Sequence, residues 1–358
     1  MKALFIVTGI GYGDATREGV NIKELIRTFP RSKIVVAGYD HSYNYFKNKY
    51  ETISIEGYKL PGKKLRVRLH RFILSNLLLP MFWFTSTLKV KLQKFNFKPD
   101  VIVSDFEPVG ISLAGLLGKK CIVVFGFDPL LYKEYKEKNK VNVKLATEAK
   151  YFEYLYKKAN MVVIPSLRKA RRSLEYAYIK PVVREMPSGS QKELMKELKL
   201  KKKPILVMLG GSDFGTKLAM NIDKVAKEFN EEIIVFGGNL AGLRNVKYIK
   251  FSNKFLKYLK VCKGVVTLGG QLTLAESLVA KKPVLCYPIK GHVEQVLNAY
   301  AIRNVVKVGK DSSLKGVRRS LKEFIRDLPK YKAKVVKYNL KGGGEKEFVD
   351  MVKIALEK

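Results

Sequence analysis

The stretch that decides the fold begins at Gly264 and reads GVVTLGGQLTLAESLVA over residues 264–280. An apolar run that predicts a strand is followed by two glycines and a helix. Glycines at such a turn let a ligand approach the backbone closely, and the unpaired amides at the helix start suit a diphosphate. Thr273 can add a hydroxyl, and Glu276 lies one turn further along. A carboxylate at that point can accept hydrogen bonds from a ribose diol.

A second strand and loop follow directly, as KKPVLCYPIKGHVEQVLNA over residues 281–299. Glu294 and Gln295 open the next helix, and a neighbouring carboxylate and amide can bracket sugar hydroxyls. Either loop alone is explained as well by an ordinary turn with solvated polar residues. The two together favour a nucleotide-sugar site. The residues predicted to bind the ligand are Gly269, Gly270, Gln271, Leu272, Thr273, Glu276, Glu294 and Gln295.

The same alternation of apolar runs and helical patterns extends over the whole chain and predicts parallel sheets covered by helices. The runs are rich in Val and Ile without alternation, as expected of strands buried on both faces. In the first half the predicted strands are 4–8, 33–37, 52–56, 101–104, 121–125 and 161–165. In the second half they are 205–209, 232–236, 246–251, 264–268 and 283–287.

The length of 358 residues and the 47% of hydrophobic residues suit two folded domains. The strand pattern restarts at Pro204 after a lysine-rich stretch. We predict an N-terminal α/β domain over 1–185 and a C-terminal one over 186–344. A last helix, 345–358, is expected to pack back on the N-terminal domain. A cleft between two such domains is a common place for a ligand.

The string GGQLTLAESLVAKKPVLCYPIKGHVEQVLNA, residues 269–299, resembles the donor-site signature of GT-B glycosyltransferases. It is similar to the MurG-like peptidoglycan N-acetylglucosaminyltransferases and the related UDP-glycosyltransferases, including archaeal members. The resemblance implies two Rossmann-like domains facing a cleft. It also implies that Gly269, Gly270 and Thr273 hold the diphosphate, that Glu276 binds ribose, and that Glu294 and Gln295 bind the donor sugar. Leu268 stands where many of these enzymes have a histidine, so one phosphate contact is missing.

Two further segments of the second half are candidates for the donor site. Gly210, Gly211 and Ser212 follow its first predicted strand. They either line the site beside the phosphates or form a tight turn in which Ser212 caps a helix. Phe251 ends the segment that, by resemblance, occupies the place where related enzymes hold the base with backbone groups.

The first strand of the chain leads to a glycine loop, TGIGYGDATR over residues 8–17. Its glycine spacing lacks the two-residue gap of the dinucleotide fingerprint. It resembles the Gly-x-Gly-x-Gly-His-x-x-Arg loop of the same families, with Asp14 in the place of the histidine. Gly11, Tyr12 and Gly13 would then form an acceptor loop. Asp14 is either the base that deprotonates the acceptor hydroxyl or the N-cap of the following helix.

Two more carboxylates follow the strand near residue 101. Asp105 and Glu107 lie at its carboxyl end, where open α/β sheets bind their ligands. Either could orient the acceptor or act as the base. Glu107 could instead interact with the dipole of the helix that Pro108 opens.

The chain is strongly basic, with 69 Lys and Arg against 32 Asp and Glu and a formal net charge of +37. This charge favours polyanions or an anionic membrane surface, or reflects a lysine-rich composition. Residues 63–96 combine an apolar, aromatic run around Trp83 with flanking lysines and arginines. That combination is typical of a segment that lies on an anionic bilayer. The alternative is a core helix with a solvated basic face.

No run of 18 to 20 consecutive apolar residues is present, and the N-terminus reads as a short strand. The three cysteines predict reduced thiols. We therefore expect a cytoplasmic protein, peripheral on the inner face of the membrane.

The function that these observations favour is a metal-independent glycosyltransferase without a cofactor, and the resemblance implies that it inverts the anomeric carbon and uses a UDP-sugar. It would move a sugar from a UDP-sugar to a hydroxyl acceptor, which the resemblance suggests is lipid-linked. The first alternative is a sugar-nucleotide epimerase or hydrolase on the same fold. The second is a nucleic-acid-binding protein, which would need a nucleic-acid module that the sequence lacks.

Overall fold

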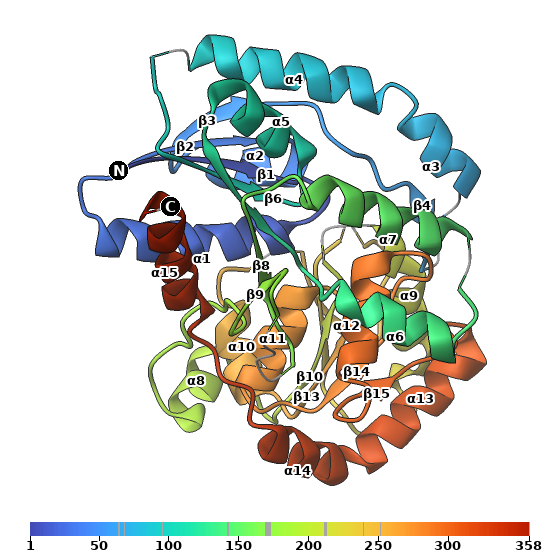
Figure 1. Cartoon of the computed structure of the whole chain (residues 1–358). Coiled ribbons are helices and arrows are strands. Elements are labelled where there is room, and N and C mark those ends of the chain that lie inside the picture. The colour runs from blue at the N-terminus through green and yellow to red at the C-terminus, as the bar shows by residue number, and fades with distance from the viewer. Residues whose placement is uncertain are drawn as a thin grey trace. The chain divides into compact units, whose positions relative to one another are not determined.

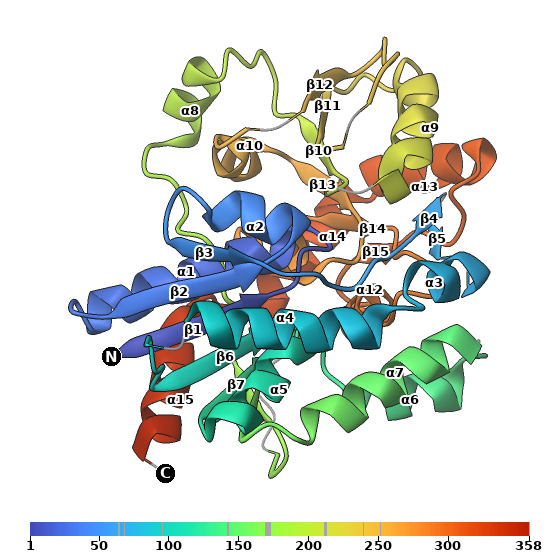
Figure 2. The same cartoon turned by 90° about the horizontal axis from the view of Figure 1, so that it is seen from above.

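The computed structural model describes residues 1–63, 65–67, 69–94, 96–141, 143–168, 173–210, 213–238, 240–250 and 252–357 (Figures 1 and 2). The chain divides into two compact units. Unit 1 consists of Met1–Pro61, Arg68–Val183 and Gly342–Lys358. Unit 2 consists of Gly62–Val67 and Arg184–Lys341.

Unit 1 contains a parallel sheet of seven strands in the order β3-β2-β1-β6-β7-β8-β9. The strands are β1 Lys2–Val7, β2 Lys33–Gly38, β3 Glu51–Ser54, β6 Val101–Asp105, β7 Lys120–Val124, β8 Met161–Pro165 and β9 Ala177–Ile179. Six of them lie where the sequence predicts strands. The interior of β1, β6 and β7 is fully buried, as the non-alternating apolar pattern indicates.

Helices of unit 1 surround this sheet. They are α1 Tyr12–Thr28, α2 Asp40–Phe46, α3 Leu69–Ser75, α4 Leu79–Gln93, α5 Pro108–Leu117, α6 Leu130–Lys138, α7 Val143–Tyr156 and α15 Gly344–Glu357. The C-terminal helix α15 packs beside α1 (Figure 1). Phe348, Val349 and Val352 of α15 belong to the same buried cluster as Phe5 and Val103 of the sheet.

Unit 2 repeats the architecture with six parallel strands in the order β12-β11-β10-β13-β14-β15. The strands are β10 Ile205–Met208, β11 Ile233–Phe236, β12 Lys247–Ile249, β13 Gly264–Thr267, β14 Val284–Cys286 and β15 Lys307–Val308. The helices are α8 Gln191–Glu197, the 3-10 turn Asp213–Gly215, α9 Thr216–Ala226, α10 Phe255–Val261, α11 Gln271–Val279, α12 Val293–Ala301, α13 Leu314–Arg326 and α14 Leu328–Tyr338. Cys121 of unit 1 and Cys286 of unit 2 are buried free thiols, as predicted, and Cys262 of unit 2 is a third.

A short hairpin that the sequence analysis does not predict joins unit 2. It consists of β4 Gly62–Lys63 and β5 Arg66–Val67. The amide of Val67 donates to Lys290 O at 3.2 Å, and the amide of Lys290 donates to Leu65 O at 2.8 Å. The hairpin therefore fastens the loop that follows β14.

The strand order reverses once in each sheet, between β1 and β6 and between β10 and β13. Loops leave a doubly wound sheet in opposite directions at such a point, which leaves a crevice outside the carboxyl ends of the strands. Asp105 ends β6, and the Gly269–Gly270 turn follows β13. The candidate residues of each unit thus gather at the point where its own sheet can bind a ligand.

Most of the large apolar side chains of α3, α4 and the turn between them are exposed. The buried residues of α4 are Leu79, Ser86, Thr87 and Val90. The exposed large side chains of the segment are Ile73, Leu74, Leu77, Leu78, Met81, Phe84, Leu88 and Leu92, which we call the apolar face. The core-helix alternative is therefore wrong, since a core helix would bury these side chains and expose Ser86 and Thr87.

One stretch among the described residues, His70–Gln93, is long and apolar enough to cross a membrane by length and composition, with a mean hydropathy of 1.2. The run is not continuously apolar, since Asn76 and Thr85 interrupt it, and the sequence alone therefore did not indicate a spanning helix. A turn at residues 76–78 separates α3 from α4, and 22% of the 18 residues that give this mean hydropathy are buried.

The packing of α15 gives a test of unit 1. Replacing Phe348, which is fully buried, with alanine should lower the free energy of unfolding of this unit by about 3–5 kcal/mol, since the change deletes a core aromatic ring. Urea unfolding followed by fluorescence would measure it. Leu356→Ala on the same helix, at 40% exposure, is the control and should change the value by less than about 0.5 kcal/mol. Equal effects of the two variants would contradict this packing.

Candidate active site

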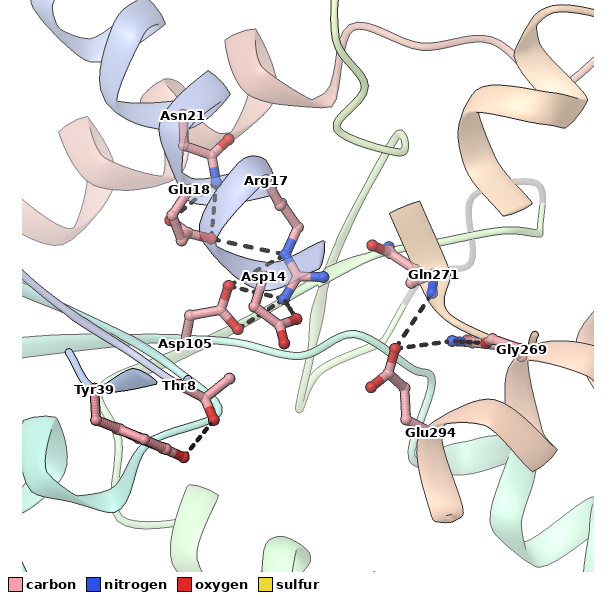
Figure 3. Close-up of polar contacts among 11 residues, drawn as sticks. Thr8, Asp14, Arg17, Glu18, Asn21, Tyr39, Asp105, Gly269, Gln271 and Glu294 are labelled. Atoms are coloured by element: carbon pink, nitrogen blue, oxygen red, sulfur yellow. Dashed lines mark hydrogen bonds and ion pairs between the residues drawn. The ribbon is translucent and has the colours of Figure 1, made fainter. Parts of the chain in front are cut away.

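The donor loop of unit 2 is held by the side chains that open α12. Gln295 Oε1 accepts from the amides of Gly269 at 3.0 Å and Ile289 at 3.1 Å. Glu294 Oε1 accepts from the amide of Gln271 at 3.3 Å (Figure 3). The structure therefore brings together the two predicted loops, and the predicted sugar-binding side chains contact the predicted diphosphate-binding turn.

The two glycines of this turn differ in what surrounds them. A Cβ added to Gly269 would lie 2.5 Å from Gln295 O, so close packing of α12 requires glycine there. A Cβ added to Gly270 would meet no atom within 4 Å. Gly270 is also the N-cap of α11 and has extended backbone angles. The open side of the turn is thus at Gly270, where a ligand could reach the first amides of α11, which have no intrahelical acceptor.

The side chains that follow divide into buried and accessible ones. Gln271 and Leu272 are 2% and 7% exposed, so their side chains serve the packing of α11 and only their backbone can face a ligand. Thr273 is partly exposed, and its carbonyl accepts from Ser277 Oγ at 2.7 Å. Leu268, in place of a histidine, is 5% exposed and belongs to the core.

Glu276 has a partner that the sequence analysis missed. Arg184 donates from Nε to Oε1 at 2.7 Å and from Nη2 to Oε2 at 2.8 Å, a two-pronged ion pair. The Glu276 side chain is fully buried, whereas 32% of the Arg184 side chain is exposed. The arginine lies outside any helix or strand and follows Pro181 by three residues. No local motif marks it, and its position became visible only with the fold.

The third donor segment is described only in part. Gly210 has a left-handed backbone with φ of 69°, and its carbonyl lies 2.4 Å from where a Cβ on Gly237 would be. Glycine is favoured at both positions for these reasons. Gly211, Ser212 and Phe251, also predicted as donor-binding residues, lie outside the described residues.

The acceptor loop of unit 1 opens helix α1. Gly11 is the N-cap, Tyr12 and Gly13 are the first helical residues, and Asp14 follows in the first turn. The alternative that Asp14 caps the helix is therefore wrong. Tyr12 stacks on His41 with 4.5 Å between ring centroids.

Behind Asp14 lies a buried acidic cluster that α1 and β6 form around one arginine. Arg17 Nη2 donates to Asp14 Oδ1 at 2.7 Å and to Asp105 Oδ1 at 2.7 Å (Figure 3). Glu18 lies 3.7 Å from Arg17 Nε. Burial and the nearby Asp105 raise the pKa of Asp14 to about 6 even though Arg17 opposes the change. Glu18 is a residue that the sequence analysis did not single out.

A strained turn separates Asp105 from Glu107. Phe106 between them has φ of 56°, a left-handed value that is rare for a bulky residue. Its ring packs on Phe152 at 4.6 Å between centroids, and Ser104 Oγ hydrogen-bonds to Glu107 O. This packing offsets a backbone strain of about 1–3 kcal/mol. The turn directs the carboxyl groups of Asp105 and Glu107 into different surroundings.

Glu107 is fully buried in unit 1, and neither carboxyl oxygen has a hydrogen-bond partner at normal distance. Tyr39 and Trp83 face it, and burial raises its pKa to about 8. The group is therefore protonated at neutral pH. Glu107 is also the N-cap residue of α5, without a side-chain capping bond.

Among the described residues, no group of three or more His, Cys, Asp or Glu side chains is arranged to hold a metal ion. The chemistry of the donor turn instead consists of backbone amides, a helix start and the Arg184–Glu276 pair.

Comparisons with known proteins agree on the class. A glycosyltransferase of Methanosarcina mazei without an assigned substrate is 24% identical over 338 residues, which cover 84% of this chain and 83% of that protein. The UDP-N-acetylglucosamine--N-acetylmuramyl-(pentapeptide) pyrophosphoryl-undecaprenol N-acetylglucosamine transferase of Flavobacterium psychrophilum is 25% identical over 326 residues. These cover 84% of this chain and 82% of that enzyme.

Solved glycosyltransferases share the fold. The spinosyn rhamnosyltransferase SpnG with its aglycone has a TM-score of 0.69 at 13% identity, covering 99% of this chain and all of that one. VinC in complex with dTDP has a TM-score of 0.65 at 14% identity and covers both chains fully. The predicted GT-B fold is thereby confirmed.

The protein is a glycosyltransferase of the GT-B class. The model of glycosyl transferase family 1 matches residues 1–329, and the chain belongs to that family.

Glu107 gives a pH-dependent test of the site's electrostatics. The carboxyl group stays protonated in the folded protein up to about pH 8, whereas in the unfolded chain it ionises near pH 4.3. The contribution of Glu107 to the free energy of unfolding is therefore complete below about pH 4.3 and is lost as the pH rises toward 8.

Glu107→Gln removes this dependence. The free energy of unfolding of the variant relative to the wild type should rise by up to about 1.4 kcal/mol for each pH unit across that window. Urea unfolding at pH 5, 6.5 and 8 measures it, with exposed Glu228→Gln as the control. A difference that does not change with pH would contradict a protonated Glu107.

Proposed function

We propose that this protein is an inverting glycosyltransferase that moves a sugar from a UDP-sugar to a hydroxyl acceptor without a metal ion or cofactor. The observation that carries the proposal is the donor turn of unit 2, in which Glu294 and Gln295 fold onto the amides of Gly269 and Gln271. Family membership supports sugar transfer, and the turn supports a diphosphate leaving group. Structural neighbours are described in complex with dTDP and with UDP.

In this proposal the diphosphate binds at the Gly269–Gly270 turn, beside the positive dipole end of α11. The amide of Gln271 would then exchange Glu294 for a phosphate oxygen. These groups stabilise the negative charge that develops on the leaving phosphate oxygen. Glu294 and Gln295, already at the turn, would contact the sugar. Glu276 accepts from the ribose, and for this the fully buried carboxylate must exchange some of its bonds with Arg184.

Asp14 is the proposed base. It is 16% exposed, whereas Asp105 and Glu107 are fully buried. The acceptor oxygen bonds to the anomeric carbon as the bond from that carbon to the phosphate oxygen breaks. The hydroxyl proton passes to Asp14, and the nucleoside diphosphate leaves. Ionised Asp14 is needed, so the rate should rise with pH through about 6.

We further propose that the apolar face of α3 and α4 lies on the inner surface of the cell membrane and that the acceptor is a lipid. Leu74, Leu77 and Phe84 are 72%, 69% and 64% exposed. Exposed Arg71 flanks the apolar face, as does Lys89, whose Nζ donates to Ser54 O at 2.6 Å. An apolar face with basic neighbours on a strongly basic chain favours anionic bilayers. Part of the basic set is not available for lipid, since Lys94 pairs with Glu51.

The donor assignment is tested with nucleotides. A UDP-sugar at 100 times its dissociation constant should stabilise the protein by about 2.7 kcal/mol, because it binds the folded state only. Glu276→Gln should weaken UDP binding by about tenfold or more, since a hydrogen bond to a charged group contributes about 1.5–3 kcal/mol. Calorimetry measures both. Glu228→Gln, which loosens the exposed pair with Arg318, is the control and should bind normally.

If no UDP- or dTDP-sugar raises the melting temperature, the donor site is refuted. Efficient release of free sugar from a bound UDP-sugar in the absence of any acceptor would identify a hydrolase instead.

Membrane association is tested with vesicles. The protein should sediment with vesicles of phosphatidylglycerol more than with phosphatidylcholine, and the difference should shrink at high salt. Leu77→Gln with Phe84→Gln should reduce binding by about tenfold or more, because each side chain contributes apolar area. Met220→Gln, an exposed apolar residue of unit 2, is the matched control. Unchanged binding of the double variant would refute the membrane assignment. Dimers that form through the apolar face would identify it as a dimer interface instead.

A further inference from the structure

The acidic cluster behind Asp14 contains three carboxyl groups and one guanidinium. Arg17 is 1% exposed, and Glu18 and Asp105 are fully buried. Arg17 contacts all three acids, at 2.7 Å for Asp14, 2.7 Å for Asp105 and 3.7 Å for Glu18. No other group of unit 1 described above combines so many charges with so little exposure.

The charges of this cluster do not balance if every acid is ionised. Three carboxylates against one guanidinium would leave a net charge of −2 in a buried place, which is strongly unfavourable. Glu18 and Asp105 are both fully buried and both contact Arg17, and burial raises the pKa of each carboxyl group. One proton held by these two acids reduces the imbalance, since a protonated carboxyl group can donate to a carboxylate. The pair then carries one negative charge, which the positive charge of Arg17 cancels.

Hydrogen bonds and ion pairs connect Asn21 to Asp14 through the other members of the cluster. Asn21 donates to both oxygens of Glu18 at 3.2 Å. Asp105 accepts from Arg17 Nη2 at 2.7 and 2.8 Å and from Nε at 3.2 Å, which fixes the plane of the guanidinium. Nη2 also donates to Asp14 Oδ1. The partly exposed acid at the end of this chain is Asp14.

We propose that Glu18, Asp105 and Arg17 are positioning residues that share one proton and one positive charge, and so hold the Asp14 carboxylate in place as a base while leaving it basic. The inference rests on the proposed function of Asp14. If Arg17 were not neutralised, its whole charge would act on Asp14, and an acid beside an uncompensated arginine loses its affinity for protons. The other titratable groups that face the cluster are Tyr156 of α7 and, from α1 and β6, the members already named.

A shared proton predicts that the two acids act non-additively. In Glu18→Gln the neutral amide replaces the proton-bearing partner, and Asp105 keeps the one negative charge. In Asp105→Asn that charge passes to Glu18. Each single variant should therefore leave the titration midpoint of Asp14 within about 0.3 pH unit of the wild type. The double variant removes the charge, and the midpoint should fall by about one pH unit or more.

The experiment follows the carboxyl carbon of Asp14 by 13C NMR across pH 4 to 8, with the signal assigned from Asp14→Asn. The pH dependence of kcat/KM with a UDP-sugar and a hydroxyl acceptor is measured in parallel. In the double variant the acidic limb of the rate profile should move with the NMR midpoint, and the plateau should fall several-fold, because a weaker base transfers protons less well. The KM for the donor should not change.

Glu24→Gln on the same helix is the control, because Glu24 forms a similar pair with Arg27 outside the cluster. If each single variant already lowers the midpoint by half of the double-variant shift, both acids are ionised and the proposal is wrong. If the double variant leaves the midpoint unchanged, Arg17 does not act on Asp14 and the proposal is also wrong. Failure of the proposed function, in which Asp14 is the base, is recognised separately with the Asp14→Asn variant. Asp14→Asn would then transfer sugar at the wild-type rate, while the NMR midpoints still report on the cluster.

Discussion

The pairing of β1 with β6, and of β10 with β13, is the constraint on which both candidate sites depend. Parallel strands bury both faces, so polar side chains are concentrated where the strands end. At these two pairs the chain leaves in opposite directions and exposes the strand ends. Asp105 ends β6, and the turn at Gly269 follows β13. The reversal of strand order in each sheet therefore places an acidic site in unit 1 and an amide-rich site in unit 2.

The two sites differ in whether the ligand or the protein carries the negative charge. In unit 2 the ligand is expected to bring the negative charge, and the protein offers backbone amides and a helix start, while Arg184 is paired with Glu276. In unit 1 the protein itself holds the negative charge, and Arg17 is surrounded by acids. Burial is what makes each arrangement specific, since exposed charges would be screened by water and salt. The strained turn at Phe106 keeps Asp105 in this cluster and Glu107 outside it.

The sequence predicted the sheets well because a buried parallel strand leaves a distinct apolar run. Strand β9 was missed because its three residues, Ala177–Ile179, are not part of a longer apolar run, unlike the equally short β14 within 283–287. Strand β15 and the hairpin strands have only two residues each and do not stand out from loops. The donor turn was predictable because its residues are contiguous. Arg184 was not, because it lies 92 residues from Glu276 and in a segment without pattern. The outward orientation of α4 was left open, since an apolar helix alone does not say which side is buried.

Helix α15 has a consequence for how the protein is made. The core of unit 1 is built from the first residues of the chain and from Phe348, Val349 and Val352, near its other end. A ribosome adds residues in order, so the segment 184–341 emerges while the first sheet still lacks one of its covering helices. Unit 2 has most of its residues in that single segment. The unit that begins first is therefore the one that is completed last, and until then the part of its core that Phe348, Val349 and Val352 complete stays uncovered.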